Sequence, residues 1–185
     1  MFILYAVLIG LVAGFLGGGR LAAIGDLRFR WAPLVVAGFL AQVVLFSDAV
    51  AERAGDLGPA LYVGSTLLVV VAVLRNAAIP GIPLVALGAA SNLAAILANG
   101  GFMPASPAAM AALGKDAPTI YSNSSVVAQP ALAPLTDIFA LPPWLPFSNI
   151  FSIGDVILAV GVVVAIATAM RLGRQVDGPV SPGGA

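Results

Sequence analysis

The 185-residue chain contains no cysteine and no histidine. The first absence excludes disulfides, thiolate chemistry and zinc sites built on Cys and His. The second excludes Ser-His and Cys-His nucleophile pairs and the side chain that most often relays protons near neutral pH. No HExxH or GxSxG motif occurs, and no Gly-rich phosphate loop follows a strand. We therefore expect no cofactor, and these absences favour a protein that is not an enzyme.

Charge is also scarce. Charged residues make up 9% of the chain, whereas a soluble domain carries about 25%. Hydrophobic residues make up 61%, and the mean hydropathy is +1.07. Because so few charges cannot cover a globular surface, we expect lipid to solvate most of it. The net charge is zero and basic patches with interleaved aromatics are absent, which excludes nucleic acid as a partner.

Long apolar runs predict the fold class. A helix that crosses a bilayer needs about 20 apolar residues, with a range of about 17–25. The first run lacks both a preceding basic region and a following small-residue cleavage site, so we interpret it as a retained helix. The prediction is an all-α membrane domain over residues 1–171 and a disordered tail over 172–185. Its bundle of five transmembrane helices is predicted at about 2–18, 31–47, 59–74, 79–98 and 153–170.

Arginine and lysine predict the orientation in the membrane. Six of the eight basic residues fall on one side of a five-span arrangement: Arg20, Arg28, Arg30, Arg75, Arg171 and Arg174. Arg53 and Lys115 fall on the other side. Loops rich in Lys and Arg stay in the cytoplasm. We therefore expect a multi-pass protein of the bacterial cytoplasmic membrane, with its N-terminus outside and its C-terminus in the cytoplasm.

The segment 99–152, between the fourth and fifth predicted helices, should lie outside the cell. It holds eight of the 14 prolines but is also apolar, which predicts an ordered, extracytoplasmic loop and not a flexible linker. Ser106 precedes Pro107 as the N-cap of a short helix, and a second short helical turn should end at Pro142. Trp144 and Phe147, set among prolines, are typical of a segment at the level of the lipid headgroups.

Glycines recur every four residues in the first predicted helix, at Gly10, Gly14 and Gly18. This spacing lines one helix face and lets another backbone approach closely. The stripe is interpreted either as a dimerisation surface or as a packing surface inside the same bundle. Both interpretations predict a helix-packing role for the three glycines.

Polar residues inside the predicted spans are the next candidates. Ser91 and Asn92 lie near the middle of the fourth span. Polar groups at that depth bond to other helices or contact a substrate. Gln42 in the second span and Ser65 and Thr66 in the third are the candidate partners.

Asp155 opens the fifth span and allows two interpretations. With Ser152 it matches the [ST]-x-x-[DE] capping pattern, in which each residue bonds to the backbone of the other. Alternatively it is a functional carboxylate at a cation or proton site, with Asp137 or Asp116 of the outside segment as its partner. The sequence does not decide between the two.

Two stretches carry a family resemblance. "NGGFMPAS" over residues 99–106 and "NIFSIGDVILAVG" over residues 149–161 resemble an uncharacterised bacterial integral-membrane family, a domain of unknown function. The likeness extends from the glycine-rich first helix to the fifth. It implies five helices and a bacterial origin and implies no mechanism. Asn99, which opens the first stretch, joins the candidate functional residues.

Three functions follow as hypotheses. The first is a non-enzymatic binding or accessory subunit for a lipid, an apolar small molecule or a membrane-protein partner. The second is a small transporter or channel component, although transport pathways usually carry ionisable groups deep in the membrane. The third is a lipid-processing enzyme that uses the carboxylates of the outside segment. Expected partners are membrane lipids and either another membrane protein or further copies of the chain.

Overall fold

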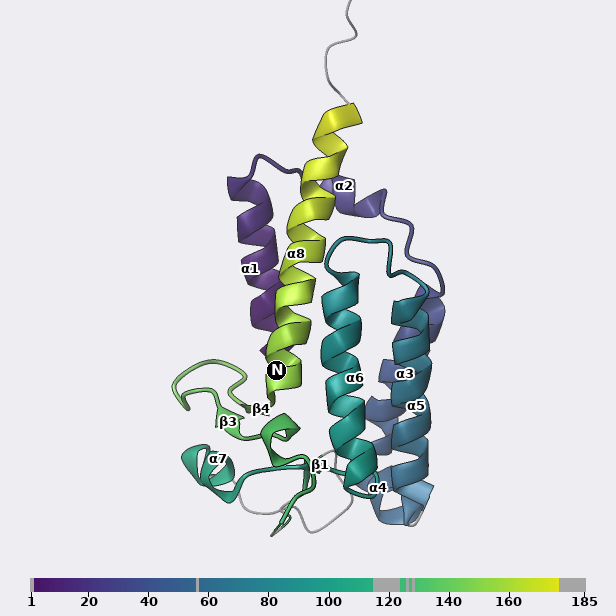
Figure 1. The fold of residues 1–185 in the computed structure, drawn as a ribbon, viewed down its shortest axis with the longest axis vertical. Coiled ribbons are helices and arrows are strands. Elements are labelled where there is room, and N and C mark those ends of the chain that lie inside the picture. Colours follow the sequence, from purple (N-terminus) through teal and green to yellow (C-terminus); the bar gives the residue numbers. More distant parts are fainter. Residues whose placement is uncertain (1, 56, 115–123, 126, 128, 177–185) are drawn as a thin grey trace, which may run out of the picture.

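The computed structural model describes residues 2–55, 57–114, 124–125, 127 and 129–176. Most of these residues are helical (Figure 1). A helix overlaps each of the five apolar runs that the sequence marks. These are α1 (Phe2–Leu16), α3 (Ala32–Leu45), α5 (Leu57–Leu74), α6 (Ile82–Ala98) and α8 (Ile153–Val176), with the short α2 (Ala22–Gly25) and α4 (Asp48–Ala54) in the links.

Two helices in the described part of the chain are long and apolar enough to cross a membrane. They are Leu57–Leu74, with a mean hydropathy of 2.1, and Ile153–Leu172, with a mean hydropathy of 2.4. The apolar helices α1, α3 and α6 are shorter, at 15, 14 and 17 residues. The protein is therefore mostly helical with two candidate membrane spans, which points to membrane association.

The long helices contact one another in the order α1, α8, α6, α5, α3 (Figure 1). Helix α8 lies between α1 and α6 and contacts both, while α3 contacts α5 on the far side. One buried cluster joins α5 to α6 and includes Val69, Val73 and Ile82. Large apolar side chains along α1 and α3 point outward and are exposed. An exposed apolar surface of this kind is what a lipid environment would cover.

Glycines bring the backbones of α6 and α8 together. Gly88 faces the backbone of Gly154, and Gly81, directly before α6, faces Gly161. A Cβ added at Gly161 would lie 2.6 Å from the Val85 backbone nitrogen and 2.7 Å from the Gly81 carbonyl oxygen. Gly81 and Gly88 are seven residues apart, and so are Gly154 and Gly161. The two glycines of each segment therefore lie on the same face, and the two faces meet. This is small-residue packing as it occurs between membrane helices.

The glycines of α1 pack in a similar way against α8. A Cβ at Gly10 would lie 3.1 Å from Ile166 Cβ, and one at Gly14 would collide with Met170. Gly18 differs, because α1 ends at Leu16 and Gly18 follows it with a φ of +74°. In that left-handed conformation glycine reverses the chain after a helix. Of the three glycines in the predicted stripe, only Gly10 and Gly14 therefore lie within α1.

The two ends of the bundle differ in what they carry. At one end lie α2, the link from α5 to α6 and the end of α8, which we call the α2 end (Figure 1). At the other lie α4 and the described part of segment 99–152, which we call the loop end. The loop end contains α7 (Pro107–Ala112), a 3-10 turn (Ala133–Leu135), the parallel pair β1 (Met103–Pro104) and β2 (Ser124–Ser125), and the antiparallel pair β3 (Phe139–Ala140) and β4 (Ile150–Phe151).

Three local predictions differ from the structure. The turn expected before Pro142 is a 3-10 turn, which ends earlier, followed by β3, whose pairing with β4 favours an extended backbone. Ser106 occupies the N-cap of α7, but its side chain makes no capping hydrogen bond. Helix α8 continues to Val176, past the predicted start of the tail at residue 172. The rest of that tail, 177–185, lies outside the described residues.

Candidate functional site

The start of α8 is held by a reciprocal cap. The backbone N–H of Ser152 donates to Asp155 Oδ2 at 3.0 Å, and the backbone N–H of Asp155 donates to Ser152 Oγ at 3.1 Å. Each bond satisfies a donor that a helix N-terminus would otherwise leave unpaired. The carboxylate also lies at the positive end of the helix dipole. The predicted capping box is confirmed.

Asn92 of α6 completes the cap from the neighbouring helix. Its Nδ2 donates to Asp155 Oδ1 at 2.8 Å, and its Oδ1 accepts from Ser152 Oγ at 2.8 Å. The three residues thus form a closed ring of hydrogen bonds, which the backbone N–H groups of Ser152 and Asp155 complete, and Ser152 is fully buried at 0% exposure. Gly154 makes room for it, because a Cβ there would collide with Asn92 Oδ1. The ring joins two helices and leaves both carboxylate oxygens of Asp155 occupied.

The other polar residues of the spans pair elsewhere. Gln42 Nε2 donates to Ser65 Oγ at 3.3 Å and to Thr66 Oγ1 at 3.1 Å, which joins α3 to α5. Gln42 therefore bonds to Ser65 and Thr66 and not to Asn92, which bonds to Asp155 of α8. Ser91, next to Asn92, has a buried hydroxyl without a hydrogen-bond partner among the described residues.

The predicted carboxylate partners of Asp155 occupy different surroundings. Asp137 is buried in the segment beside β1, where its backbone N–H donates to the Pro104 carbonyl and its carbonyl accepts from Ser106 N, each at 2.9 Å. Asp116 lies outside the described residues. The carboxylate of Asp155 is bonded to Asn92 and Ser152, so the cluster that forms is a carboxylate with an amide and a hydroxyl.

Two asparagines hold the chain at opposite ends of the bundle. Asn99 exchanges two hydrogen bonds of 2.9 Å with the backbone of Ala131 and donates to the carbonyl four residues earlier at 2.7 Å. Asn76 does the same with the backbone of Arg30, at 2.7 and 2.8 Å, and donates to its own i−4 carbonyl at 2.8 Å. Each side-chain amide thus bonds to both the N–H and the carbonyl of one residue, as the backbone of a neighbouring strand would. Asn76 is not among the residues that the sequence pattern singles out, although its place just after a helix matches that of Asn99.

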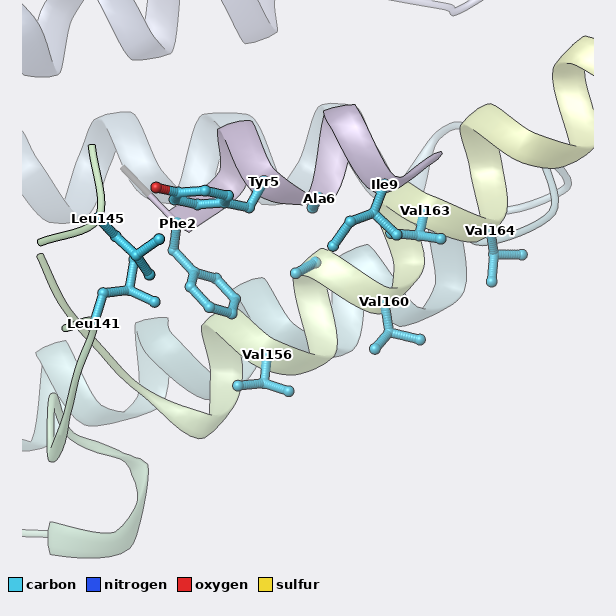
Figure 2. Close-up of a pocket in the computed structure, with 11 residues that line it drawn as sticks. Phe2, Tyr5, Ala6, Ile9, Leu141, Leu145, Val156, Val160, Val163 and Val164 are labelled. Carbon is cyan, nitrogen blue, oxygen red and sulfur yellow. The ribbon is translucent and has the colours of Figure 1, made fainter. Parts of the chain in front are cut away.

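A cavity of about 410 Å³ lies between α1, the first half of α8 and residues 141–145 (Figure 2). The Tyr5 hydroxyl is the polar side-chain group among its lining residues, and it donates to the Pro146 carbonyl. The remaining walls are hydrocarbon. The lining residues are Phe2, Tyr5, Ala6, Ile9, Leu141, Leu145, Val156, Ala159, Val160, Val163 and Val164.

Aromatic rings fix the loop end to α1 beside this cavity. Phe151 stacks on Phe2 with ring centroids 4.4 Å apart and an interplanar angle of 13°. On the β3 side it stacks on Phe139, at 5.4 Å and 27°. Such pairs add about 0.5–1.5 kcal/mol beyond the burial of their area. The first residue of α1 is therefore anchored to the strand pair β3–β4.

Comparison with known proteins gives one match. A family model described as "Family of unknown function (DUF5317)" matches residues 26–167. Both stretches that carry the resemblance fall within the matched range, whereas α1 lies before it. No curated protein matches, and no solved structure matches.

Proposed function

The chain belongs to the family of unknown function DUF5317, and we propose that it is a five-span membrane protein that binds an apolar molecule without converting it. The bound molecule would be a lipid acyl chain or a hydrophobic small molecule. The cavity between α1 and α8 is the observation that carries this proposal.

The size and chemistry of the cavity support binding. Its volume of about 410 Å³ falls within the range of about 300–1,000 Å³ typical of ligand pockets. Its lining offers hydrocarbon surface from two helices and one loop, and the Tyr5 hydroxyl is already bonded to the protein. Such walls select for apolar area and provide no group for acid–base or nucleophilic chemistry. A binding function without catalysis fits these walls best.

The lengths and outer surfaces of the helices support five spans. At 1.5 Å per residue, α1, α3 and α6 are roughly 21–26 Å long, somewhat short of the roughly 30 Å hydrocarbon core. A bilayer accommodates short helices by local thinning, at a modest cost. The outward faces of α1 and α3 carry exposed large apolar side chains, which lipid would cover favourably.

The distribution of arginine supports the orientation. The links that carry Arg20, Arg28, Arg30 and Arg75 all lie at the α2 end (Figure 1). Hydrogen bonds join these links to their neighbours: the backbone N–H of Arg20 donates to the Met170 carbonyl at 2.9 Å. By the positive-inside rule the α2 end faces the cytoplasm. The loop end then faces outside.

A transporter or channel component is the second candidate. It is favoured by the ring of Asn92, Ser152 and Asp155, because an ionisable group between membrane helices is often functional. Against it, the cap accounts for the two bonds between Ser152 and Asp155, and the two bonds to Asn92 account for the rest of the ring by joining α6 to the start of α8. The binding proposal therefore needs fewer assumptions.

Photochemical labelling tests the proposal. The protein would be reconstituted with a phosphatidylcholine that carries a diazirine in its acyl chain, and labelled residues mapped by mass spectrometry. Binding in the cavity predicts labels concentrated in residues 2–9, 141–145 and 156–164. Equal labelling of the outward face of α3 would show only general contact with lipid and would refute the proposal.

A further inference from the structure

The loop 141–147, with the sequence "LPPWLPF", has two apolar sides. Leu141 and Leu145 line the cavity and lie close to Phe2 and Tyr5 of α1 (Figure 2). Trp144 is not among the residues that line the cavity, and its side chain is 78% exposed. No charged residue occurs between Asp137 and Asp155. The loop therefore presents an uncharged aromatic surface to its surroundings while it forms one wall of the cavity.

Turns and prolines restrict the conformation of this loop. The Leu145 N–H donates to the Pro142 carbonyl at 3.0 Å, and the Ser148 N–H donates to the Leu145 carbonyl at 3.3 Å, so two turns follow in succession. Prolines fix φ within them. Phe147 adopts a φ of +56°, a conformation that bulky residues rarely take. Such strain persists where the surrounding structure imposes it, and it clusters at functional positions.

We propose that the 141–147 loop docks in the lipid headgroup layer at the loop end, with Trp144 as its anchor, so that the cavity opens to acyl chains of that leaflet. This inference rests on the proposed function and adds the source of the ligand, a bilayer lipid of the outer leaflet. Tryptophan favours this layer because its ring is apolar and its N–H can bond to water or headgroups.

Two observations favour a lipid surface over a protein partner. The loop is tied to α1 through the Tyr5–Pro146 hydrogen bond, and the exposed side chains of Leu4 and Leu8 on α1 belong to the surface that lipid would cover. Trp144 therefore lies at the edge of that surface, at the same depth in the membrane as the first residues of α1. The lack of charge also fits, because a charged loop would be drawn into water and away from this layer.

Tryptophan fluorescence tests the docking directly. The chain has two tryptophans, Trp31 and Trp144, so Trp31→Phe leaves Trp144 as the sole emitter. This variant would be reconstituted in phosphatidylcholine vesicles whose chains are brominated either near the glycerol or near the terminal methyl. A place in the headgroup layer predicts blue-shifted emission and stronger quenching by the shallow bromines than by the deep ones.

The reciprocal variant Trp144→Phe is the matched control. It leaves Trp31, which lies at the start of α3 at the α2 end and is also exposed. Quenching of Trp31 without quenching of Trp144 would overturn the docking and leave the membrane protein intact. Quenching of neither would show that the proposed membrane embedding itself is wrong.

Stronger quenching of Trp144 by the deep bromines would also overturn the docking. Far-UV circular dichroism establishes that each variant keeps its helices. Should Trp31→Phe lose them, Trp31→Tyr serves in its place.

Discussion

Asn92 and Asp155 lie 63 residues apart in the chain and share a hydrogen bond of 2.8 Å across the contact between α6 and α8. The bond connects the first turn of α8 to the interior of α6. Because Ser152 is bonded to both residues, the point at which the chain leaves segment 99–152 and enters α8 is fixed. The wall of the cavity that α8 provides is thereby held in place.

Removing the amide from this ring should weaken the fold. In Asn92→Leu, the half-buried Asp155 Oδ1 loses its donor and the buried Ser152 hydroxyl loses its acceptor, and an unsatisfied buried group costs about 1–3 kcal/mol. Asp155→Asn should cost less, because its amide can accept from Ser152 N and donate to a reoriented Asn92. The lost charge–dipole interaction is worth about 0.3–1 kcal/mol. Thermal unfolding in mild detergent measures both variants, and a costlier Asp155→Asn would contradict this ranking.

Asp155→Asn also distinguishes a residue that only caps α8 from a carboxylate with its own chemistry. If Asp155 acts only as a cap, complementation by Asp155→Asn, Asp155→Leu and Ser152→Ala should follow their stabilities, with Ser152→Ala costing about 0.5–2 kcal/mol. A carboxylate with its own chemistry predicts that Asp155→Asn is folded and inactive. That result would favour the transporter hypothesis.

The close contact of α6 and α8 predicts opposite effects of one substitution at two sites. Gly161→Ala should destabilise the protein, because the added Cβ would meet the backbone of α6 at 2.6 Å, and overpacking typically costs about 1–3 kcal/mol. Gly64→Ala in α5 has no atom within 4 Å of the added Cβ. It should stabilise by about 0.5–1 kcal/mol, since alanine is the better helix former. Melting temperatures that shift in the same direction would exclude the packing argument.

The hydrogen bonds of Asn76 to Arg30 and of Asn99 to Ala131 should differ in how much they stabilise the fold. Asn76 is buried, whereas the bonds of Asn99 to Ala131 are exposed to solvent. Asn76→Ala therefore leaves the Arg30 backbone unpaired, at a cost of about 1–3 kcal/mol, while water can replace the bonds lost in Asn99→Ala. Chemical denaturation in detergent compares the two, and the account would be wrong if Asn99→Ala were the more harmful.

The orientation is tested by reporter fusions. A reporter that is active only in the cytoplasm should work after Gln175 and fail when inserted after Gly114. This expectation rests on the arginine-rich links at the α2 end. Equal activity at both positions would contradict an odd number of spans.

Local patterns in the sequence predicted local structure well. The five apolar runs each contain a helix, because hydrophobic length is a property of the run itself. The Ser152–Asp155 cap was also predictable, since both partners lie within one turn. The four-residue spacing extends the predicted helix through Gly18, because periodicity alone does not show where a glycine ends a helix.

Contacts between distant segments were not predictable in the same way. The partner of Asn92 depends on how α6 packs on α8, which one sequence does not reveal. The spacing of Gly81 to Gly88 and of Gly154 to Gly161 is visible in the sequence, and it could have suggested that the two segments meet. The cavity forms only when α1, α8 and the 141–147 loop are in their final positions, so no local sequence pattern predicts it.

The central claim is that the cavity between α1 and α8 binds a lipid chain, and retention of phospholipid by matched variants tests it most directly. Val160 and Val12 are 50% and 49% exposed, but only Val160 lines the cavity. Native mass spectrometry after extensive detergent washing would measure the phospholipid that stays bound. The account predicts that Val160→Phe, which fills part of the cavity, loses the lipid, whereas Val12→Phe keeps it as the unsubstituted chain does. Equal retention by the two variants would contradict the account.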